Sequence, residues 1–267
     1  MTTPAPPRIL SIAGSDSSGG AGIQADIKTI AMLGGYAMTA VTAITAQNTR
    51  GVQGIAGIAP EMVARQIAAC VSDIGVDAVK IGMLHEVPVI AAVAAALEGL
   101  AVPVVLDPVM IATSGAALID PQAVAALREQ LFPRARLLTP NLPELAALTG
   151  RSFTGTAAMV AAAEALAEAS GAAVLAKGGH ADGETITDVL VVPGERPRFY
   201  EHARIDTVHT HGTGCTLSSA IATLLGRGES LAEAVRLGRE FVFAAIAAAP
   251  GYGGGHGPLG HQAVRPA

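Results

Sequence analysis

Near its N-terminus the chain runs ILSIAGSDSSGGAGIQADIKTIAML from Ile9 to Leu33. The apolar residues Ile9–Ala13 predict a short strand, and helical spacing over Gly22–Leu33 predicts a helix after the glycine-rich loop that separates them. Further apolar runs, such as Val102–Leu106, alternate with helical patterns along the chain. This alternation predicts an α/β fold: one domain over residues 1–267, with a central, mostly parallel sheet and helices on both faces.

The remaining elements follow from the same patterns. Strands are predicted over Tyr36–Ala46, Ala78–Ile81, Arg136–Thr139 and Ala172–Ala176, with a late antiparallel pair at Val189–Val192 and Arg198–Ile205. Helices are predicted around Met62–Ile74 and over Val89–Leu97, Pro121–Leu131, Leu142–Leu148, Thr156–Ala169, Thr216–Leu225 and Leu231–Ala248. Both ends, residues 1–7 and 251–267, are expected to be flexible, and the Gly-rich stretch Gly251–Gly260 is predicted to be a mobile loop.

Composition excludes several classes of protein. Apolar residues make up 51% of the chain, which excludes intrinsic disorder. The net charge is −5 without a basic cluster, so a nucleic-acid partner is not expected. No apolar run is long enough to span a membrane, and the N-terminus does not resemble a signal peptide. Cys70 and Cys215 are too few for a disulfide framework. A cytoplasmic protein without a membrane partner is therefore expected.

Polar residues follow several predicted strands. Asp107 follows Val102–Leu106, Asn141 and Glu144 follow the strand that ends at Thr139, and Lys177 follows the strand that ends at Ala176. The carboxyl ends of parallel strands meet at one edge, where open α/β sheets bind ligands. Two carboxylates, an amide and a lysine there favour Mg²⁺ with a polyphosphate. The alternative is that these residues only form turns and helix caps.

A second signal is the segment His211-Gly-Thr-Gly-Cys215, which directly precedes a predicted helix. Its glycines let backbone N–H groups face an anion, and the helix dipole favours negative charge there. The arrangement suits a phosphoryl group in transfer. A thiol in a first helical turn is expected to have a lowered pKa, so Cys215 could act as a base toward a hydroxyl. The alternative is a small buried residue, which is the interpretation preferred for Cys70.

The loop Gly14–Gly22 is a second glycine loop, but it matches neither a Walker A loop nor a dinucleotide fingerprint. It could hold a phosphate or close over a small molecule. Asp26 on the following helix and Gln47 after the next strand could bind a polar heterocycle through paired hydrogen bonds. For Asp26 the alternative is solvent exposure in the first helical turn. Lys28, on the same helix, is expected to lie on the surface.

Together these segments resemble the hydroxymethylpyrimidine/phosphomethylpyrimidine kinases of thiamine biosynthesis, in the ribokinase-like superfamily. The matching motifs occur in family order over nearly the whole chain: Ala13–Asp26, Thr45–Val52, Lys80–Met83, Leu106–Met110, Thr139–Glu144, Lys177–His180 and Thr210–Ser218. Most ribokinase-like enzymes carry Asp where this chain has Cys215, so the Gly-Thr-Gly-Cys motif is the most specific of them.

The resemblance implies a ribokinase-like, homodimeric enzyme. It would use ATP and Mg²⁺ to phosphorylate 4-amino-5-hydroxymethyl-2-methylpyrimidine and then the resulting monophosphate to the diphosphate. The implied catalytic residues are Gly212, Thr213, Gly214 and Cys215, whose backbone amides would form the anion hole. The side chain of Cys215 would also be the general base. The implied substrate residues are Gly14, Asp26, Gln47, Met83 and Val109. ATP would meet Lys177, Asn141 and Thr210, and Asp107 and Glu144 would hold the metal.

The chain departs from the family pattern at Ser17, Thr113, Ala116, Val208, His209 and Gly260. None of these changes removes a residue assigned to catalysis. Val208 and His209 lead into the anion hole, so they could alter nucleotide affinity or preference. Two rival interpretations stay open: a pyridoxal kinase of the same fold, and a pyrimidine-binding sensor that has lost turnover.

Overall fold

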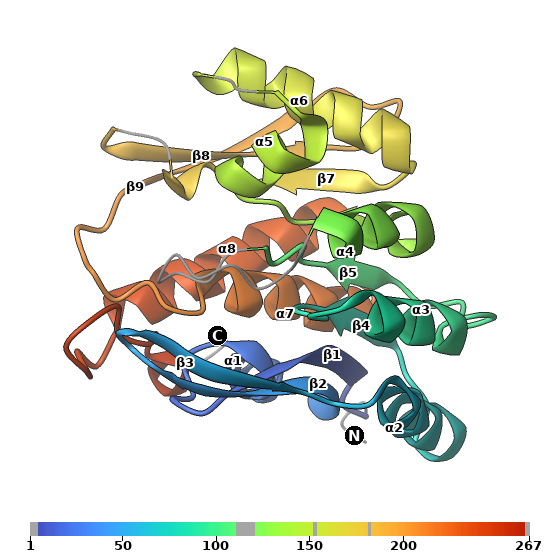
Figure 1. Cartoon of the computed structure of the whole chain (residues 1–267). Coiled ribbons are helices and arrows are strands. Elements are labelled where there is room, and N and C mark those ends of the chain that lie inside the picture. The colour runs from blue at the N-terminus through green and yellow to red at the C-terminus, as the bar shows by residue number, and fades with distance from the viewer. Residues whose placement is uncertain (1–4, 111–120, 152–153, 181–182, 265–267) are drawn as a thin grey trace.

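The computed structural model describes residues 5–110, 121–151, 154–180 and 183–264 (Figure 1). Within these residues, nine strands form one sheet in the order β3-β2-β1-β4-β5-β6-β7-β8-β9. The strands are β1 (Arg8–Asp16), β2 (Tyr36–Asn48), β3 (Gly51–Gly57), β4 (Ala78–Ile81), β5 (Val104–Leu106), β6 (Leu137–Leu138), β7 (Ala173–Ala176), β8 (Thr185–Val191) and β9 (Arg198–Ala203). Pairing from β2 through to β7 is parallel, and β3, β8 and β9 pair antiparallel at the edges. The predicted α/β class and the late antiparallel pair are confirmed.

Helices cover both faces of this sheet, as predicted (Figure 1). The helices are α1 (Gly22–Met32), α2 (Pro60–Asp73), α3 (Val87–Ala96), α4 (Pro121–Ala126), α5 (Leu142–Thr149), α6 (Thr156–Ser170), α7 (Thr213–Gly226) and α8 (Leu231–Ala247). The α1, α7 and α8 helices pack on one face, and α2 to α6 pack on the other. Among the described residues, no helix is both long and apolar enough to cross a membrane.

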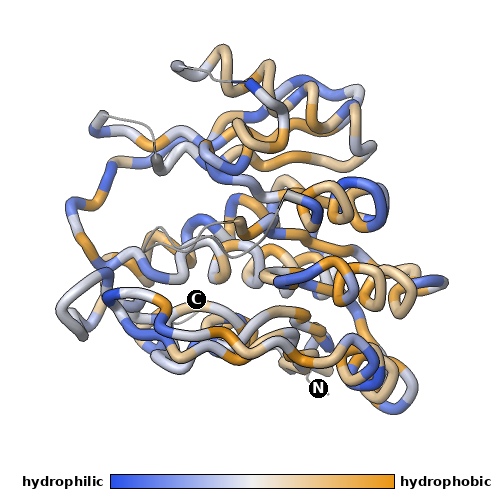
Figure 2. The backbone as a smooth tube through the Cα atoms, in the orientation of Figure 1, coloured by the Kyte–Doolittle hydropathy of each residue, from blue (hydrophilic) through white to orange (hydrophobic). Residues whose placement is uncertain are grey.

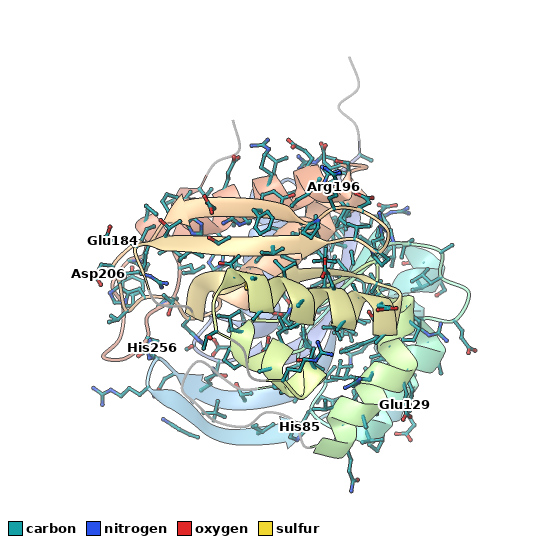
Figure 3. All side chains as sticks on the ribbon, turned by 90° about the horizontal axis from the view of Figure 1, so that it is seen from above. His85, Glu129, Glu184, Arg196, Asp206 and His256 are labelled. Carbon is teal, nitrogen blue, oxygen red and sulfur yellow. The ribbon has the colours of Figure 1, made fainter. Side chains whose placement is uncertain are left out.

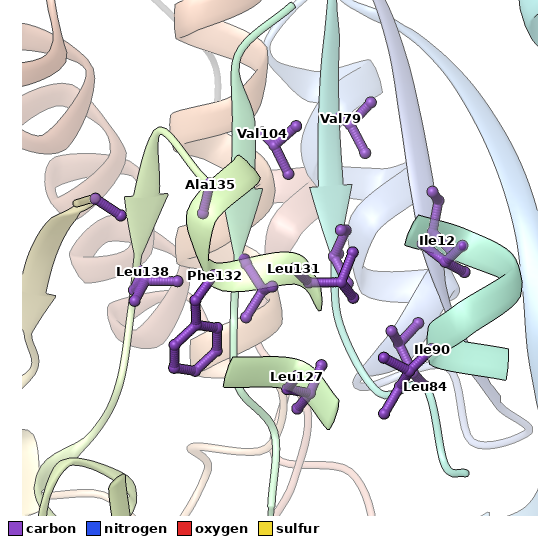
Figure 4. Packing of buried hydrophobic residues seen from close by; sticks show 14 of the residues in the cluster. Ile12, Val79, Leu84, Ile90, Val104, Leu127, Leu131, Phe132, Ala135 and Leu138 are labelled. Atoms are coloured by element: carbon purple, nitrogen blue, oxygen red, sulfur yellow. The ribbon is translucent and has the colours of Figure 1, made fainter. Parts of the chain in front are cut away.

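The central strands are mostly apolar because each of them is covered on both sides. Ile9 belongs to the core beside α7 and α8, whereas Leu10 and Ile12 belong to the core beside α2 and α3. Successive side chains of a strand point to opposite faces, so one short strand contributes residues to the hydrophobic cores on both faces of the sheet. Figure 4 shows the second core, where Leu131 and Leu138 pack near the strands. In Figure 2 the central strands and the helices against them carry the colour of hydrophobic residues.

Polar side chains lie around this double core. Glu129, Glu184 and Arg196 are exposed and project from its periphery (Figure 3).

Several boundaries differ from the prediction. β3 was not predicted, because its glycines disfavour a strand in isolation; it forms by pairing with β2. The helix predicted over Pro121–Leu131 changes into a π-helical turn at Leu127–Leu131. α7 begins at Thr213, three residues earlier than predicted. Thr113 and Ala116, two departures from the family pattern, lie outside the described residues.

The Gly-rich tail is attached to three other parts of the chain. Gly257 O accepts from His211 N (3.1 Å), His256 N donates to Thr49 O (2.9 Å), and Gly260 N donates to Ala245 O (2.9 Å). A Cβ on Gly260 would lie 2.0 Å from Ala248 O, so the close approach there requires glycine. The expected mobility of residues 251–260 stays a prediction, and these contacts identify what such a movement would break.

His261 fixes the end of this tail. Its side chain is buried, and its Nε2 lies 2.8 Å from Thr216 Oγ1 on α7. Burial, and to a smaller extent the nearby charge of Lys28, lower the pKa of His261 to about 4. The imidazole is therefore neutral in the folded protein at neutral pH.

We expect His261 to make the protein less stable in acid. Between its ordinary pKa of 6.5 and its folded pKa of about 4, the unfolded chain binds more protons, so the free energy of unfolding falls as the pH falls. In the wild-type protein, His261 should make the free energy of unfolding about 2 kcal/mol lower at about pH 4.5 than at about pH 7. In the His261→Gln variant this contribution to the difference should be absent. Urea denaturation at both pH values measures this difference.

His256→Gln is the matched control, since His256 is an exposed histidine of the same tail. It should keep the pH dependence of the wild-type protein. Equal pH dependence in wild type and His261→Gln would contradict the assignment.

Candidate active site

Three strand ends bring the predicted phosphate and metal residues to one edge of the sheet. Asp107 follows β5, Asn141 follows β6 and Lys177 follows β7, and these strands are parallel neighbours. Lys177 Nζ lies 2.9 Å from Asp107 Oδ1, which also accepts a hydrogen bond of 2.9 Å from Thr139 Oγ1. The structure thus brings a buried carboxylate and an ammonium into contact at the predicted edge.

Asn141 and Glu144 form a capping box at the start of α5. The Asn141 side chain accepts from Glu144 N, and Glu144 Oε2 accepts from Asn141 N, each at 2.9 Å. The helix-cap alternative is therefore confirmed for this pair. Burial raises the pKa of Glu144; Lys177 opposes that shift, and the negative charge of Asp107 adds to it. Glu144 therefore has a place in the cluster as well as in the cap.

The pair Asp107 and Glu144 fits a magnesium ion better than a metal that needs an all-protein cage. The two carboxylates are close enough for the charge of one to raise the pKa of the other, a repulsion that a divalent cation relieves. In the described part of the chain, no group of three or more His, Cys, Asp or Glu is arranged to hold a metal. Mg²⁺ is commonly bound by one or two carboxylates together with water and phosphate oxygens.

The N-terminus of α7 faces this same cluster. Gly212 caps the helix with a φ of 87°, and a Cβ there would lie 1.9 Å from Gly20 O, so only glycine fits. A Cβ on Gly214 would lie 3.0 Å from Asp107 Oδ2 and 3.3 Å from Lys177 Nζ. The N–H groups of a first helical turn have no acceptor within the helix. Apart from Thr213 N, which donates to Thr210 O, these groups can therefore bind an anion beside Lys177.

Thr210 and Thr213 shape the turn before this helix. Thr213 donates to Thr210 O from its Oγ1 at 2.6 Å and from its backbone N at 3.3 Å. Both contacts close the turn. Contact of Thr210 with a nucleotide stays a prediction.

The predicted low pKa of Cys215 is wrong. Burial raises the pKa of the Cys215 thiol to about 11; Lys80 opposes the shift, and the charges of Asp26 and Asp107 add to it. A hydrogen bond from Gly22 N favours the thiolate but does not offset the rest. The helix dipole acts on a thiol that is poorly solvated and close to two carboxylates, so desolvation dominates. In this structure Cys215 is a thiol at neutral pH.

The two glycine loops are joined by a contact that sequence reasoning missed. Asp16 Oδ2 lies 2.9 Å from His211 Nε2, and both side chains are buried. The same carboxylate accepts N–H groups of Ser18, Gly20 and Ala21. Burial raises the pKa of Asp16, but these hydrogen bonds more than offset that effect and hold the pKa well below its usual range. The loop therefore folds around an ionised carboxylate.

Three of the predicted substrate residues lie together. A Cβ on Gly14 would lie 2.4 Å from the Cε of Met83, so the absence of a side chain at Gly14 makes room for Met83. Met83 and Ala43 form a small apolar cluster against which Val109 packs. This arrangement presents an apolar surface beside the first glycine loop.

Gln47, the fourth predicted substrate residue, is held by the same loop. Ser17 Oγ donates to Gln47 O at 2.8 Å and accepts from Gln47 N at 2.9 Å. The Gln47 side chain accepts a hydrogen bond from Thr45 Oγ1. Ser17, a departure from the family pattern, thus orients Gln47 in this chain.

Asp26, the fifth predicted substrate residue, is held in a buried ion pair. Its side chain is fully buried, and its oxygens accept hydrogen bonds from Lys80 Nζ, Ser11 Oγ and Ser219 Oγ. The solvent-exposed alternative is therefore wrong, and a substrate contact of Asp26 stays a prediction. Burial lowers the pKa of Lys80, but the charge and hydrogen bonds of Asp26, together with the charges of Cys215 and Asp107, raise the pKa overall. The structure assigns Asp26 to a buried ion pair beneath the site.

Lys28 was expected to be an ordinary surface residue, and that expectation is wrong. Its Nζ donates a hydrogen bond to Gly19 O, within the first glycine loop. Burial lowers the pKa of Lys28, and the charge of Asp16 opposes that shift. Lys28 therefore helps to hold the loop that Asp16 organises.

Comparison with known proteins agrees with this geometry. Residues 16–260 match the family described as phosphomethylpyrimidine kinase. A relative from Rhizobium meliloti named hydroxymethylpyrimidine/phosphomethylpyrimidine kinase is 50% identical over 94% of this chain and 96% of its own length. One from Escherichia coli with the same name is 46% identical over 94% of this chain and 96% of its own.

Solved structures share the fold. A Bacillus subtilis pyridoxal kinase in complex with ADP has a TM-score of 0.88 and 38% identity, over 97% of this chain and 98% of that one. A Clostridium difficile phosphomethylpyrimidine kinase has a TM-score of 0.80 and 40% identity, over 90% of this chain and 99% of that one. The ribokinase-like fold is therefore confirmed, and the chain belongs to the phosphomethylpyrimidine kinase family.

Proposed function

We propose that this chain transfers the γ-phosphoryl group of ATP to the hydroxyl of 4-amino-5-hydroxymethyl-2-methylpyrimidine, and then a second one to the monophosphate. The observation that carries the proposal is the approach of the α7 N-terminus to Lys177 and Asp107. This approach brings the backbone N–H groups of the α7 N-terminus, the Lys177 ammonium and the Asp107 carboxylate close together at the same edge of the sheet. The names of the relatives at 50% and 46% identity support the pyrimidine as acceptor.

In each step a bond forms between the acceptor oxygen and the γ-phosphorus, and the bond to the bridging oxygen of ADP breaks. Such a transfer depends mainly on alignment and on stabilising charge. Lys177 and the amides of Gly212 to Cys215 would bind the phosphoryl oxygens. Gln47 would bind the ring, and Met83 would pack against it. The thiolate form of Cys215, a minor species at neutral pH, would accept the hydroxyl proton in the first step.

Asp107 and Glu144 would hold Mg²⁺, which would neutralise charge on the phosphate oxygens. Asn141 and Thr210 would line the nucleotide side. The Asn141 side chain caps α5 in this structure.

A pyridoxal kinase is the second candidate, because solved pyridoxal kinases share this fold at 38% and 31% identity. A pyrimidine-binding sensor would bind the same ligand without consuming ATP. One experiment separates all three: ADP release with MgATP and either hydroxymethylpyrimidine or pyridoxal, with products resolved by mass. Monophosphate and diphosphate of the pyrimidine are expected. Pyridoxal phosphate alone would favour the second candidate, and the absence of any product would refute both kinases.

We also propose a homodimer in the cytoplasm, as the family resemblance implies. The mass in solution, from light scattering during size-exclusion chromatography, tests the dimer. A single-chain mass at micromolar concentration would refute it.

A further inference from the structure

The turn that follows Lys177 is tied to a buried ion pair on the far side of β8. Gly178 N donates a hydrogen bond of 2.7 Å to Asp188 Oδ1, and Arg239 Nε donates one of 2.7 Å to Asp188 Oδ2. Both side chains of the pair are mostly buried, with 7% of Asp188 and 11% of Arg239 exposed. Each carboxylate oxygen of Asp188 thus has its own donor, one from the turn and one from α8.

Arg239 is itself held from three directions. Its Nη2 donates to Tyr200 O at 3.0 Å and contacts His202 Nδ1 at 2.7 Å, and its guanidinium lies 5.4 Å from the centre of the Tyr200 ring. His202 packs edge-on against Phe243. Burial lowers the pKa of His202, and the charge of Arg239 lowers it further, so its Nδ1 can accept the hydrogen bond. The guanidinium therefore links α8, β8 and β9 in one fixed geometry.

The turn packs closely against β8 and leaves no room for a side chain at Gly178. A Cβ on Gly178 would lie 2.0 Å from Thr187 O, so the turn lies directly against the backbone of β8. Gly179 O accepts a hydrogen bond of 3.0 Å from Arg204 Nη1. Asp188 and Arg204 hold successive peptides of the turn, and Lys177 immediately precedes them. None of these groups belongs to the cluster of Asp107 and Glu144.

We propose that Asp188 and Arg239 are positioning residues for nucleotide binding: they hold the Lys177–Gly179 turn so that the Lys177 ammonium faces the α7 N-terminus. This inference rests on the proposed role of Lys177 in binding ATP phosphates. Arg239 acts only through Asp188, and neither residue contacts the acceptor. Loss of Arg239 alone, which leaves the buried Asp188 carboxylate without its charged partner, should therefore weaken nucleotide binding and leave pyrimidine binding unchanged.

The test compares Arg239→Gln with the double variant Asp188→Asn/Arg239→Gln. The single variant leaves the Asp188 carboxylate without its charged partner, and we expect MgADP affinity, measured by calorimetry, to fall about tenfold. In the double variant an amide replaces the unpaired carboxylate and can still accept from Gly178 N, so most of the affinity should return. The KM for ATP should follow the same order, whereas the KM for the pyrimidine should stay constant.

Arg236→Gln is the matched control. Arg236 lies one turn before Arg239 on α8 but forms exposed ion pairs with Glu233 and Glu240. It should bind MgADP as the wild type does. If Arg236→Gln weakens binding as much as Arg239→Gln, or if the folded Arg239→Gln variant binds MgADP normally, the proposal fails.

Arg239→Lys is the alternative variant if Arg239→Gln does not fold. It keeps the buried positive charge but cannot make the several guanidinium hydrogen bonds to Asp188, Tyr200 and His202 at once. Unchanged MgADP affinity in that variant also overturns the proposal. The direct binding measurement separates this inference from the proposed function. A wild-type protein that binds MgADP but forms no pyrimidine phosphate refutes the function, and the comparison of affinities still decides the role of the pair.

Discussion

The Cys215→Ala variant is expected to phosphorylate hydroxymethylpyrimidine ~10²–10⁴-fold more slowly than the wild type, as loss of a general base does. Cys215 lies in the first turn of α7, beside the amides that would bind the phosphoryl group. Because its pKa is raised to about 11, only a small thiolate fraction is present at neutral pH, and that fraction grows with pH. The wild-type rate should therefore rise with pH, and this rise should be absent in the variant. Single-turnover kinetics over a pH series measure both effects.

The second phosphorylation provides an internal control for this prediction. Its acceptor is a phosphate oxygen that is already ionised, so it needs no base. The same variant should show a much smaller defect with the monophosphate as substrate. Equal defects in both steps would assign Cys215 to packing or phosphate binding, and turnover near the wild-type level in the first step would remove the base role altogether.

The fold was predictable from sequence wherever burial alone determines the distribution of apolar residues along a strand or helix. β4 was predicted with its observed bounds, Ala78–Ile81, because a strand covered on both faces is mostly apolar, and here only Lys80 interrupts the apolar residues. The cluster of Asp107 and Lys177 was predictable for a related reason, since parallel strands end at a common edge. β3 was not predictable in this way. Its pairing with β2 supplies a stability that its own glycines do not.

The chemistry of the site was harder to predict, because it depends on distances between remote segments. The helix-dipole argument for Cys215 considered one helix and omitted both the desolvation of the thiol and the charges of two carboxylates, Asp26 on α1 and Asp107 after β5. The contact between Asp16 and His211 joins residues 195 positions apart. No local sequence pattern predicts a contact between residues so far apart. The two glycine loops gave only a weak indication, because their glycines allow the two backbones to approach each other.

For Asp26 a signal was present. Ile23, Asp26 and Ile30 are spaced three and four residues apart, so they share one face of α1, and all three are buried. A carboxylate on an apolar stripe requires a buried partner. With three lysines in the chain, Lys80 in the apolar strand Ala78–Ile81 was the natural candidate.

The Lys80→Met variant is expected to lower the free energy of unfolding by about 3–5 kcal/mol, the usual cost of leaving one charge of a buried pair without its partner. Lys80 Nζ lies 2.9 and 2.8 Å from the two oxygens of Asp26, and both side chains have no exposed surface. Ser11 and Ser219 would remain as donors, but neither carries a compensating charge. Urea denaturation followed by circular dichroism measures the loss, since the chain has no Trp.

A double variant separates the cost of the unpaired charge from that of lost packing. In Asp26→Asn/Lys80→Met the amide can still accept from Ser11 or Ser219 and no charge is buried, so most of the lost stability should return. The exposed pair Arg8 and Asp77 is the matched control, because water already solvates both charges; Asp77→Asn should cost far less. If the double variant is as unstable as Lys80→Met, the loss arises from packing around the lysine stem, and the electrostatic account of this pair is wrong.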